Sequence, residues 1–415
     1  MTDTHPVRPN RPMRFLALAA ALACAMPLQA QQTQVFTNFR LFDGTGADVV
    51  EDAAMLVRDG RIVAIGPAAT LQLPADAAST DLGGAFVMPG MINAHGHVAQ
   101  DTARKLDISA QYGITTVLSL GGEDASHVAL RDAQDPAAPD TARLLVAGPI
   151  QERLESPADA VLGVAQLRTL DVDWVKARVM NGNMSDEVAR VLVDSAHAAD
   201  LKVAAHIYTL DEAKGMLRAG LDVLAHSVRD QPVDVELLEL MDENQSCLIP
   251  TLTREVSTYV YADRPDFFDD PFFANAASAA EIAALSEPQA QERYAGNVAR
   301  GEADLAMAQR NLKIAHDAGL RVALGTDSGA FADRFVGYFE HLELQLMVDA
   351  GLTPRDALLA ATSVAADCMD MEGVGTLANG NWADFLVLAD DPLRDIGNTR
   401  TLQEVWLAGT RFTLD

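Results

Sequence analysis

Short apolar runs alternate with longer segments of helical periodicity between residues 90 and 376, and this alternation constrains the fold more than any other feature. Such a pattern is typical of parallel strands joined by crossover helices. Eight runs predict an α/β fold built on a (β/α)8 TIM-like barrel, whose functional groups gather at the carboxyl ends of the strands. The runs are residues 90–94, 115–120, 143–147, 174–179, 202–205, 223–225, 247–252 and 321–324.

Strand patterns at the two ends of the chain indicate a second, smaller domain. They cover residues 35–42, 54–58, 61–65, 382–388, 404–407 and 411–413. Asp59-Gly60 between two of these runs indicates a hairpin, because glycine readily supplies the positive φ of the turn. Neither end could bury a core alone, and chain ends often lie close together. We therefore predict a composite β-sandwich domain of residues 31–89 and 377–415, beside a barrel domain of residues 90–376.

The first 30 residues have the pattern of a cleaved secretory signal. Three arginines precede the apolar stretch 15–26, which is too short to span a bilayer, and Ala30 comes before a polar run. We expect cleavage after Ala30 and export, most simply to the periplasm. An N-terminal helix packed in the core is disfavoured because the segment lacks a periodic polar face. Lipid anchoring at Cys24 is a weaker alternative, since the preceding residues only partly match a lipoprotein cleavage box.

Charge and cysteine content narrow the class of partner. A formal net charge of −28 argues against nucleic acid or an anionic membrane surface as the partner. After cleavage only Cys247 and Cys368 would remain, too few to indicate a disulfide scaffold. No later stretch is long and apolar enough to cross a membrane. We therefore expect a soluble protein that binds a small-molecule substrate, and a homo-oligomer stays open.

His95 and His97 form a His-x-His pair directly after an apolar step. Because side chains alternate along a strand, both imidazoles point the same way, and one short segment presents two nitrogen ligands to one point. Such a pair is also an ordinary hydrogen-bonding feature, so its interpretation depends on further ligands downstream.

Four more candidate ligands lie in the predicted strands or at their ends. Lys176 lies in a half-buried run, where an unpaired ammonium is costly and its pKa falls; a neutral amine can take up carbon dioxide as a bridging carbamate. His206 and His226 each end a run, 20 residues apart, and Asp327 follows the last run. Each residue alone has a structural explanation: a lysine that reaches the barrel mouth, a structural histidine, or an aspartate in a turn. The ordered set predicts a metal centre.

This ordered set resembles that of the amidohydrolase superfamily, in particular the imidazolonepropionase-related branch that contains Xaa-Pro dipeptidases and ochratoxin-hydrolysing amidases. The resemblance covers nearly the whole mature chain. The segments that carry it are Pro89-Gly90-Met91-Ile92-Asn93-Ala94-His95-Gly96-His97, Gly113-Ile114-Thr115-Thr116, Gly351-Leu352-Thr353-Pro354, Ala361-Thr362 and Ala383-Asp384-Phe385.

The resemblance implies two divalent metal ions. It assigns His95, His97 and Asp327 to the first ion, His206 and His226 to the second, and a carbamate on Lys176 to the bridge between them. Imidazole and carboxylate ligands suit zinc, although manganese, cobalt and iron stay open. Imidazolonepropionase itself is expected to hold one metal without the lysine, so Lys176 favours a binuclear hydrolase.

Further roles concern catalysis and substrate binding. By the same resemblance, Asp327 would accept the proton of the attacking water and Tyr208 would stabilise the oxyanion, although Tyr208 could instead be a packing residue. Arg229 and Arg178 are candidates to bind a substrate carboxylate, or to pair with an acid such as Asp230. Residues 259–273 contain six aromatics, which could roof the pocket or form a subunit contact.

The interpretation that unites these features is a secreted, binuclear metal-dependent amidohydrolase. It would cleave a C–N amide bond of a dipeptide or N-acyl amino acid by attack of a metal-bridging hydroxide. A lactonase or phosphotriesterase could use the same metal centre. A non-catalytic, metal-binding exported protein is the alternative of another class, disfavoured because a passive module has no use for a candidate base.

Overall fold

Eight short parallel strands form the centre of the computed structural model, which describes residues 33–413. Each strand coincides with one of the eight predicted runs. They are β6 (Met91–Gly96), β7 (Ile114–Ser119), β8 (Arg143–Val146), β9 (Trp174–Arg178), β10 (Lys202–His206), β11 (Val223–Ala225), β12 (Cys247–Ile249) and β13 (Arg321–Val322). The predicted signal segment, with Cys24, lies outside the described residues.

The eight strands belong to two parallel sheets. One has the order β6-β7-β8 and the other β13-β12-β11-β10-β9. Two isolated parallel bridges join their ends, Gly96 with Ser328 and Gln151 with Ala177. The fold is therefore a mixed α/β fold in which strands adjacent in sequence are adjacent in space.

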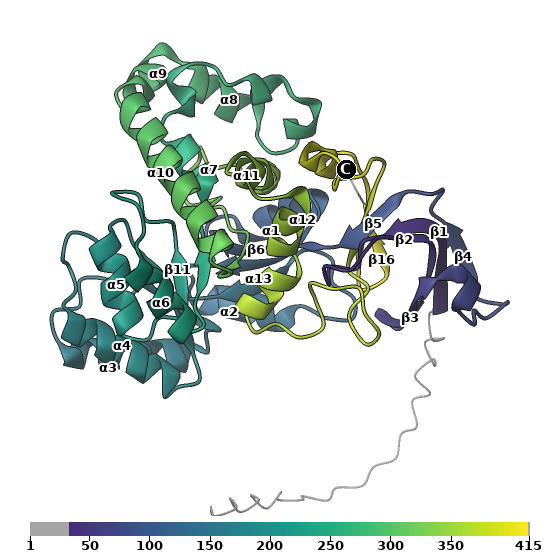
Figure 1. Ribbon diagram of the computed structural model, residues 1–415, viewed down its shortest axis with the longest axis horizontal. Coiled ribbons are helices and arrows are strands. Elements are labelled where there is room, and N and C mark those ends of the chain that lie inside the picture. The colour runs from purple at the N-terminus through teal and green to yellow at the C-terminus, as the bar shows by residue number, and fades with distance from the viewer. Residues whose placement is uncertain (1–32, 414–415) are drawn as a thin grey trace, which may run out of the picture. The chain divides into compact units, whose positions relative to one another are not determined.

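Helices connect the strands, and Figure 1 shows them packed around the strands. Helix α4 illustrates why they form: Ser185 caps it by accepting from the Val188 amide, acidic residues fill its first turn, and its apolar face is buried. The α-helices are α1 (Thr102–Gln111), α2 (Ala125–Ala133), α3 (Pro157–Leu170), α4 (Asp186–His197), α5 (Leu210–Arg218), α6 (Val235–Glu243), α7 (Leu252–Ser257), α8 (Ala279–Ser286), α9 (Pro288–Ala295), α10 (Val298–Asp317), α11 (Tyr338–Asp349), α12 (Pro354–Ala360) and α13 (Ser363–Cys368). Within residues 33–413, no helix is long and apolar enough to cross a bilayer.

Short 3-10 helices occupy several loops. They are η1 (Ala68–Thr70), η2 (Val260–Ala262), η3 (Asp266–Asp269), η4 (Pro271–Phe273) and η5 (Ile396–Arg400). Three of them fall in the aromatic segment that follows α7.

Strands from the two ends of the chain do assemble, in a single hydrogen-bonded sheet. Its order is β16-β15-β14-β5-β1-β2-β3, with β4 paired to β1, and Figure 1 shows the purple early strands beside the yellow late ones. The prediction was a sandwich of two sheets, but β5 pairs with β1 on one side and with β14 on the other, which joins both ends in one sheet. The strands are β1 (Thr33–Leu41), β2 (Val50–Arg58), β3 (Arg61–Pro67), β4 (Ala78–Asp81), β5 (Phe86–Pro89), β14 (Phe385–Leu388), β15 (Leu402–Leu407) and β16 (Thr410–Phe412).

The alternation of side chains along the central strands sorts them into two apolar clusters. Val175 and Ala177 of β9 belong to a cluster shared with residues of the surrounding helices. Trp174 belongs to a second cluster built mainly from strand residues, together with Ala204 and Val223. Lys176 has the same parity as Trp174, so its side chain leaves β9 on the face of that second cluster.

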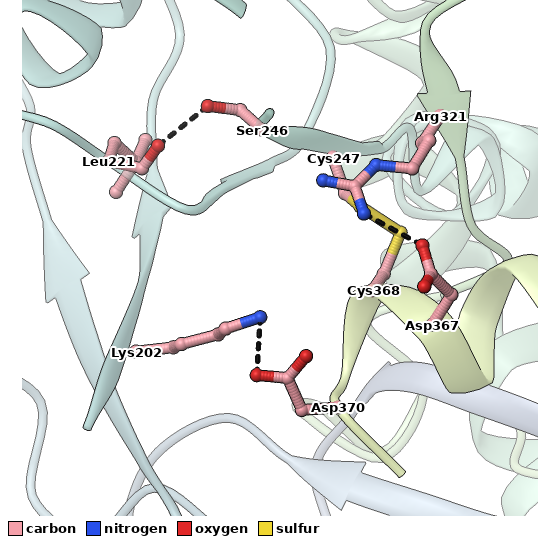
Figure 2. Close-up of a disulfide and its surroundings, with 8 residues drawn as sticks. All are labelled: Lys202, Leu221, Ser246, Cys247, Arg321, Asp367, Cys368 and Asp370. Atoms are coloured by element: carbon pink, nitrogen blue, oxygen red, sulfur yellow. Dashed lines mark hydrogen bonds and ion pairs between the residues drawn. A yellow bond between two sulfur atoms is a disulfide. The ribbon is translucent and has the colours of Figure 1, made fainter. Parts of the chain in front are cut away.

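A disulfide ties the start of β12 to the end of α13. Cys247 and Cys368 are 121 residues apart in sequence, and their Cα atoms are 6.0 Å apart. Figure 2 shows two ion pairs beside the disulfide, Arg321 with Asp367 at 2.7 Å and Lys202 with Asp370 at 2.6 Å. The sequence did not predict this pairing, because cysteine spacing alone does not define connectivity.

Candidate metal centre

The six predicted metal ligands converge at the carboxyl ends of the strands. Asp327 Oδ1 lies 2.8 Å from His97 Nε2 and 3.3 Å from His95 Nε2. Lys176 Nζ lies 3.1 Å from His95 Nε2. The His226 ring is 4.8 Å from that of His95, and 4.3 Å from that of His206, between ring centroids. Side chains separated by up to 232 positions therefore meet at one centre, as the sequence predicts; their binding of metal stays a prediction.

The donor set fits a cation because it contains buried nitrogens that need a partner. The Nε2 atoms of His206 and His226 are buried and have no hydrogen-bond partner among the described residues. His226 Nδ1 is 2.6 Å from Thr251 Oγ1, which fixes the ring and leaves Nε2 for the centre. One donor atom each from His95, His226 and Asp327 lie within 4.8 Å of one another, a grouping able to hold a metal ion.

Burial keeps His95, His206 and His226 neutral, as metal ligands must be. Desolvation lowers the pKa of His95 to about 3, helped by the nearby charge of Lys176. Desolvation likewise lowers the pKa values of His206 and His226 well below the usual value. Free imidazole lone pairs are therefore available at neutral pH.

Asp327 remains ionised in spite of its burial. Desolvation alone would raise its pKa, but the Arg334 guanidinium and hydrogen bonds from His95 and His97 lower it well below the usual value. Arg334 Nη1 contacts Asp327 Oδ2 directly. Asp327 therefore offers one anionic oxygen, Oδ1, as a candidate metal ligand, while its Oδ2 is paired with the Arg334 guanidinium.

Lys176 is buried beside these groups without a carboxylate partner. Only 3% of the residue is exposed, and desolvation lowers its pKa to about 8. Within residues 33–413 it forms no ion pair at 4.0 Å or less, and its hydrogen-bond contact is with His95. Such a lysine is neutral in a sizeable fraction of molecules near pH 8.

Backbone geometry at the strand ends is unusual at three residues of the centre. His226 has φ of 124°, Thr251 has 51° and Asp327 has 58°. Positive φ is costly for residues other than glycine, and such strain is concentrated at functional sites. Here it directs His226, its partner Thr251 and Asp327 toward one point.

A cavity of about 430 Å³ opens onto this centre. His97, Lys176, His206 and Asp327 line it together with several arginines. Arg178 lines it with 45% of its side chain exposed, and its nearest acid is Glu152 at 3.7 Å. Arg254, Phe331 and Arg334 also line the cavity.

Arg229 and Tyr208, two predicted substrate contacts, do not line this cavity. The Arg229 guanidinium is buried, donates to Glu255 Oε1 at 2.6 Å and to the Ile207 carbonyl, and lies over the Tyr208 ring. The Tyr208 hydroxyl donates to Asp304 at 2.9 Å. Arg229 is therefore paired with an acid and Tyr208 is held by contacts within the protein, which are the structural alternatives to substrate binding given for these two residues.

Sequence reasoning missed Arg254 and Arg334, which the structure places in the cavity wall. Arg254 lies on α7, five residues after β12 ends at Ile249. It donates to both oxygens of Glu255 at 2.8 Å. Its position after an apolar run is the signal that had selected His206 and His226, and it could have selected Arg254. Arg334 lies in a loop without periodicity, so no sequence signal pointed to it.

The aromatic segment 259–273 is mainly packed into the protein. Tyr261, Phe268 and Phe273 are buried, and their rings contact one another and Phe335. None of its residues lines the cavity. The structure therefore favours interior packing over a roof, because these rings find apolar partners on α11 and the loop before it.

The family of the chain follows from its similarity to known proteins. Residues 86–411 match the model of the amidohydrolase family, and residues 53–72 match that of the imidazolonepropionase-like composite domain of bacteria. The chain belongs to the amidohydrolase family, which confirms the resemblance seen in its sequence.

Relatives cover most of the chain. Imidazolonepropionase of Deinococcus deserti is 26% identical over 406 residues, covering 87% of this chain and 92% of that protein. A solved structure of a provisionally named prolidase from Bifidobacterium longum has a TM-score of 0.76 and 27% identity, covering 92% and 94% of the two chains. The structure of A. niger ochratoxinase has a TM-score of 0.71 and 20% identity, covering 92% of this chain and 96% of that chain, and shows that the two proteins share a fold.

These similarities define the general activity. The protein is an amidohydrolase-type enzyme, related to imidazolonepropionase and prolidase, that hydrolyses C–N bonds. Members of this family act on small molecules and typically use metal ions. The converging histidines and Asp327 are the candidate site for such ions.

Proposed function

We propose that this protein is an exported enzyme that holds two divalent cations, zinc by ligand type, and cleaves the amide bond of a dipeptide or N-acyl amino acid. His95, His97 and Asp327 would hold one cation, His206 and His226 the other, and a carbamate on Lys176 would bridge them. The two linked parallel sheets are interpreted as one closed (β/α)8 barrel of residues 90–376, and residues 31–89 with 377–415 as the smaller domain.

The observation that carries the proposal is the position of Lys176. Its amine faces His95 inside the centre, where an ammonium has no carboxylate partner among the described residues. The ammonium first releases one proton, and addition of carbon dioxide to the neutral amine then forms an N–C bond and releases a second proton, so that a buried cation without a carboxylate partner among residues 33–413 becomes an anion. A carbamate supplies two oxygen ligands, which suits a bridge between cations.

The reaction needs a nucleophile, a proton acceptor and a polarised carbonyl. Bound cations would supply Lewis acidity and lower the pKa of water. Asp327 is ionised and lines the cavity, and it would accept the proton of the attacking water. It can then pass that proton to the departing amine, so that the carboxylate is regenerated.

Substrate size and charge follow from the cavity. A volume of about 430 Å³ suits a compound of dipeptide size. Arg178 lines the cavity with 45% of its side chain exposed, and its one ion pair within the described chain, with Glu152, is long at 3.7 Å, so its guanidinium would be able to bind the substrate carboxylate. Phe331 is 65% exposed at the same cavity and offers an apolar surface to the acyl group.

The disulfide supports the export part of the proposal. Disulfides persist in oxidising compartments such as the periplasm and are rare in the cytosol. Cys247 and Cys368 are already within bonding geometry. The N-terminal pattern of residues 1–30 supplies the independent argument.

A substrate panel tests the proposed reaction. Enzyme loaded with defined metal should hydrolyse dipeptides and N-acyl amino acids with kcat/KM at least about 100-fold above that for a lactone or a phosphotriester, about 2.7 kcal/mol in transition-state stabilisation. A preference for the lactone or the phosphotriester would contradict the proposed amidase activity and indicate a lactonase or a phosphotriesterase. Absence of turnover on every substrate of the panel, by protein with two bound cations, would favour a binding protein.

Lys176→Ala tests the bridge. The variant should hold close to one cation per chain after loading and dialysis, whereas the wild type should hold two, as measured by elemental analysis. Lys202→Ala is the matched control, because Lys202 begins the neighbouring strand β10 and its ammonium pairs with Asp370 away from the centre. Two cations per chain in Lys176→Ala would contradict the bridging role.

A further inference from the structure

Helix α11 carries two buried glutamates that accept hydrogen bonds from segments next to the candidate ligands. Glu340 is 1% exposed and Glu343 is fully buried. They are three residues apart, so both side chains leave the same face of the helix. Neither forms an ion pair with a lysine, arginine or histidine among the described residues, so no cation offsets their charge.

Glu340 connects the segment that carries His95 with the segment that carries Asp327. Its Oε1 accepts from Asn93 Nδ2 at 2.6 Å and from Ser328 Oγ at 2.7 Å. Asn93 in turn accepts from the His95 amide at 2.9 Å through its own Oδ1. The neighbour of Asp327 and the partner of the His95 backbone are therefore held by one carboxylate oxygen.

Glu343 performs the corresponding connection next to His226. Its two oxygens accept from the amides of Leu252 and Thr253, each at 2.7 Å, and from Thr253 Oγ1 at 2.8 Å. These residues directly follow Thr251, whose hydroxyl contacts His226 Nδ1. Thr253 Oγ1 also lies 3.1 Å from the carbonyl oxygen of Thr326, the residue before Asp327.

Fold stability does not account well for this arrangement. Two buried carboxylates without a cation are costly to desolvate, and well-packed apolar residues would stabilise a helix contact at lower cost. What the carboxylates provide is several acceptor sites that fix separate loops at once. Two of these segments carry the candidate ligands His95 and Asp327, and the third follows Thr251, which contacts His226.

We propose that Glu340 and Glu343 are positioning residues that hold the metal centre from α11, Glu340 acting on the side of His95 and Asp327, and Glu343 on the side of His226. The division into two sides rests on the proposed binuclear function. The positioning itself rests on the hydrogen bonds alone. Groups that orient metal ligands typically contribute a factor of about 10 to 100 in metal affinity.

Glu340→Gln and Glu343→Gln test the inference, because an amide nearly matches the carboxylate in size but turns one acceptor into a donor that faces other donors. Asp349→Asn is the matched control: it makes the same change on the same helix at an exposed residue. Zinc alone is titrated into metal-free protein against a competing chelator. Each variant should lose about 10- to 100-fold in zinc affinity, while the control stays within about twofold.

A second readout does not need bound metal. Hydrogen exchange of the metal-free protein should become faster at residues 93–97 and 326–328 in Glu340→Gln, and at residues 251–254 in Glu343→Gln. Unchanged affinity and unchanged exchange would overturn the inference. Faster exchange throughout the chain would overturn it as well, because the glutamates would then support the whole fold rather than the centre.

The titration separates this inference from the proposed function. If the wild type binds one zinc ion, the binuclear proposal fails, and the positioning role is still decided by the affinity for that ion. If the wild type binds two and the variants bind them equally well, the positioning role fails alone. A wild type that binds no zinc would overturn both.

Discussion

At the scale of single residues, Asp327 contacts two histidines of the centre and one arginine. Its Oδ1 lies 2.8 Å from His97 Nε2 and 3.3 Å from His95 Nε2, and its second oxygen pairs with Arg334. The pKa of Asp327 is held well below its usual value, so the carboxylate is ionised across the neutral range. An ionised carboxylate can serve as both ligand and proton acceptor.

Asp327→Asn should therefore remove nearly all turnover while the chain stays folded. The amide keeps the size of the side chain but can neither accept the proton nor offer an anionic ligand. Steady-state kinetics on zinc-saturated enzyme, with circular dichroism as the folding control, measure the effect. Activity within about tenfold of the wild type, about 1.4 kcal/mol in transition-state stabilisation, would count against the role as base.

Arg178 and Arg229 were both predicted to bind a substrate carboxylate, and the structure gives them different surroundings. Arg178→Met should raise KM for a carboxylate-bearing substrate by about 10- to 150-fold, the range of a charge-assisted hydrogen bond of about 1.5 to 3 kcal/mol. The same substrate with its carboxylate converted to an amide should show little change. An equal rise in KM for both substrates would contradict carboxylate recognition by Arg178.

Arg229→Met provides the contrast. Removal of this guanidinium leaves Glu255 with Arg254 as its remaining partner in a buried environment. Loss of one partner of a buried pair typically costs about 3 to 5 kcal/mol in folding free energy. We therefore expect a lower urea midpoint for Arg229→Met, with KM changed less than in Arg178→Met. A normal midpoint with a large rise in KM would restore Arg229 as a substrate ligand.

At the scale of elements, the strands were predictable because each is an apolar run that ends at a change in composition. The same rule selected His206 and His226 at the ends of their runs and Asp327 three residues after Leu324, and the structure brings all three to the strand ends. The connecting α11 was less informative. Glu340 and Glu343 look like ordinary polar positions of a helix, and only the tertiary structure shows that they face inward.

Helix α11 also carries a buried histidine that makes stability depend on pH. His341 Nε2 lies 2.8 Å from the Tyr112 carbonyl oxygen, and Nδ1 lies 2.9 Å from Thr399 Oγ1. Burial lowers the pKa of His341 to about 3 from its usual 6.5. As pH falls from 6.5 toward 3, the unfolded chain binds a proton that the folded chain does not, so the free energy of unfolding falls.

His341→Gln should reduce this pH dependence. One group that titrates only in the unfolded chain contributes up to about 1.4 kcal/mol per pH unit within that window. Urea unfolding of metal-free wild type and variant at pH 7, 6 and 5 measures the difference in slope. Equal slopes would show that His341 does not resist protonation in the folded state, whatever the effect of the substitution at pH 7.

At the scale of the whole molecule, the sequence predicted that both chain ends share one β unit but not how they pair. Hydrophobic alternation identifies strands and leaves their order open, so the single sheet with β5 between β1 and β14 came from the structure. The disulfide was equally inaccessible. Two cysteines 121 residues apart become neighbours only because α13 packs against the starts of the central strands.

This disulfide should stabilise the fold without affecting the reaction. In the chain-entropy account, a cross-link that closes a loop of about 100 residues contributes about 4.7 kcal/mol. The double variant Cys247→Ala/Cys368→Ala should therefore lose about 2 to 5 kcal/mol in urea unfolding, and a reducing agent should lower only the wild-type midpoint. Turnover should persist, since Cys247 begins β12 whereas the candidate ligands follow the strand ends. A loss below about 1 kcal/mol would show that the flanking ion pairs and apolar packing hold α13 without the cross-link.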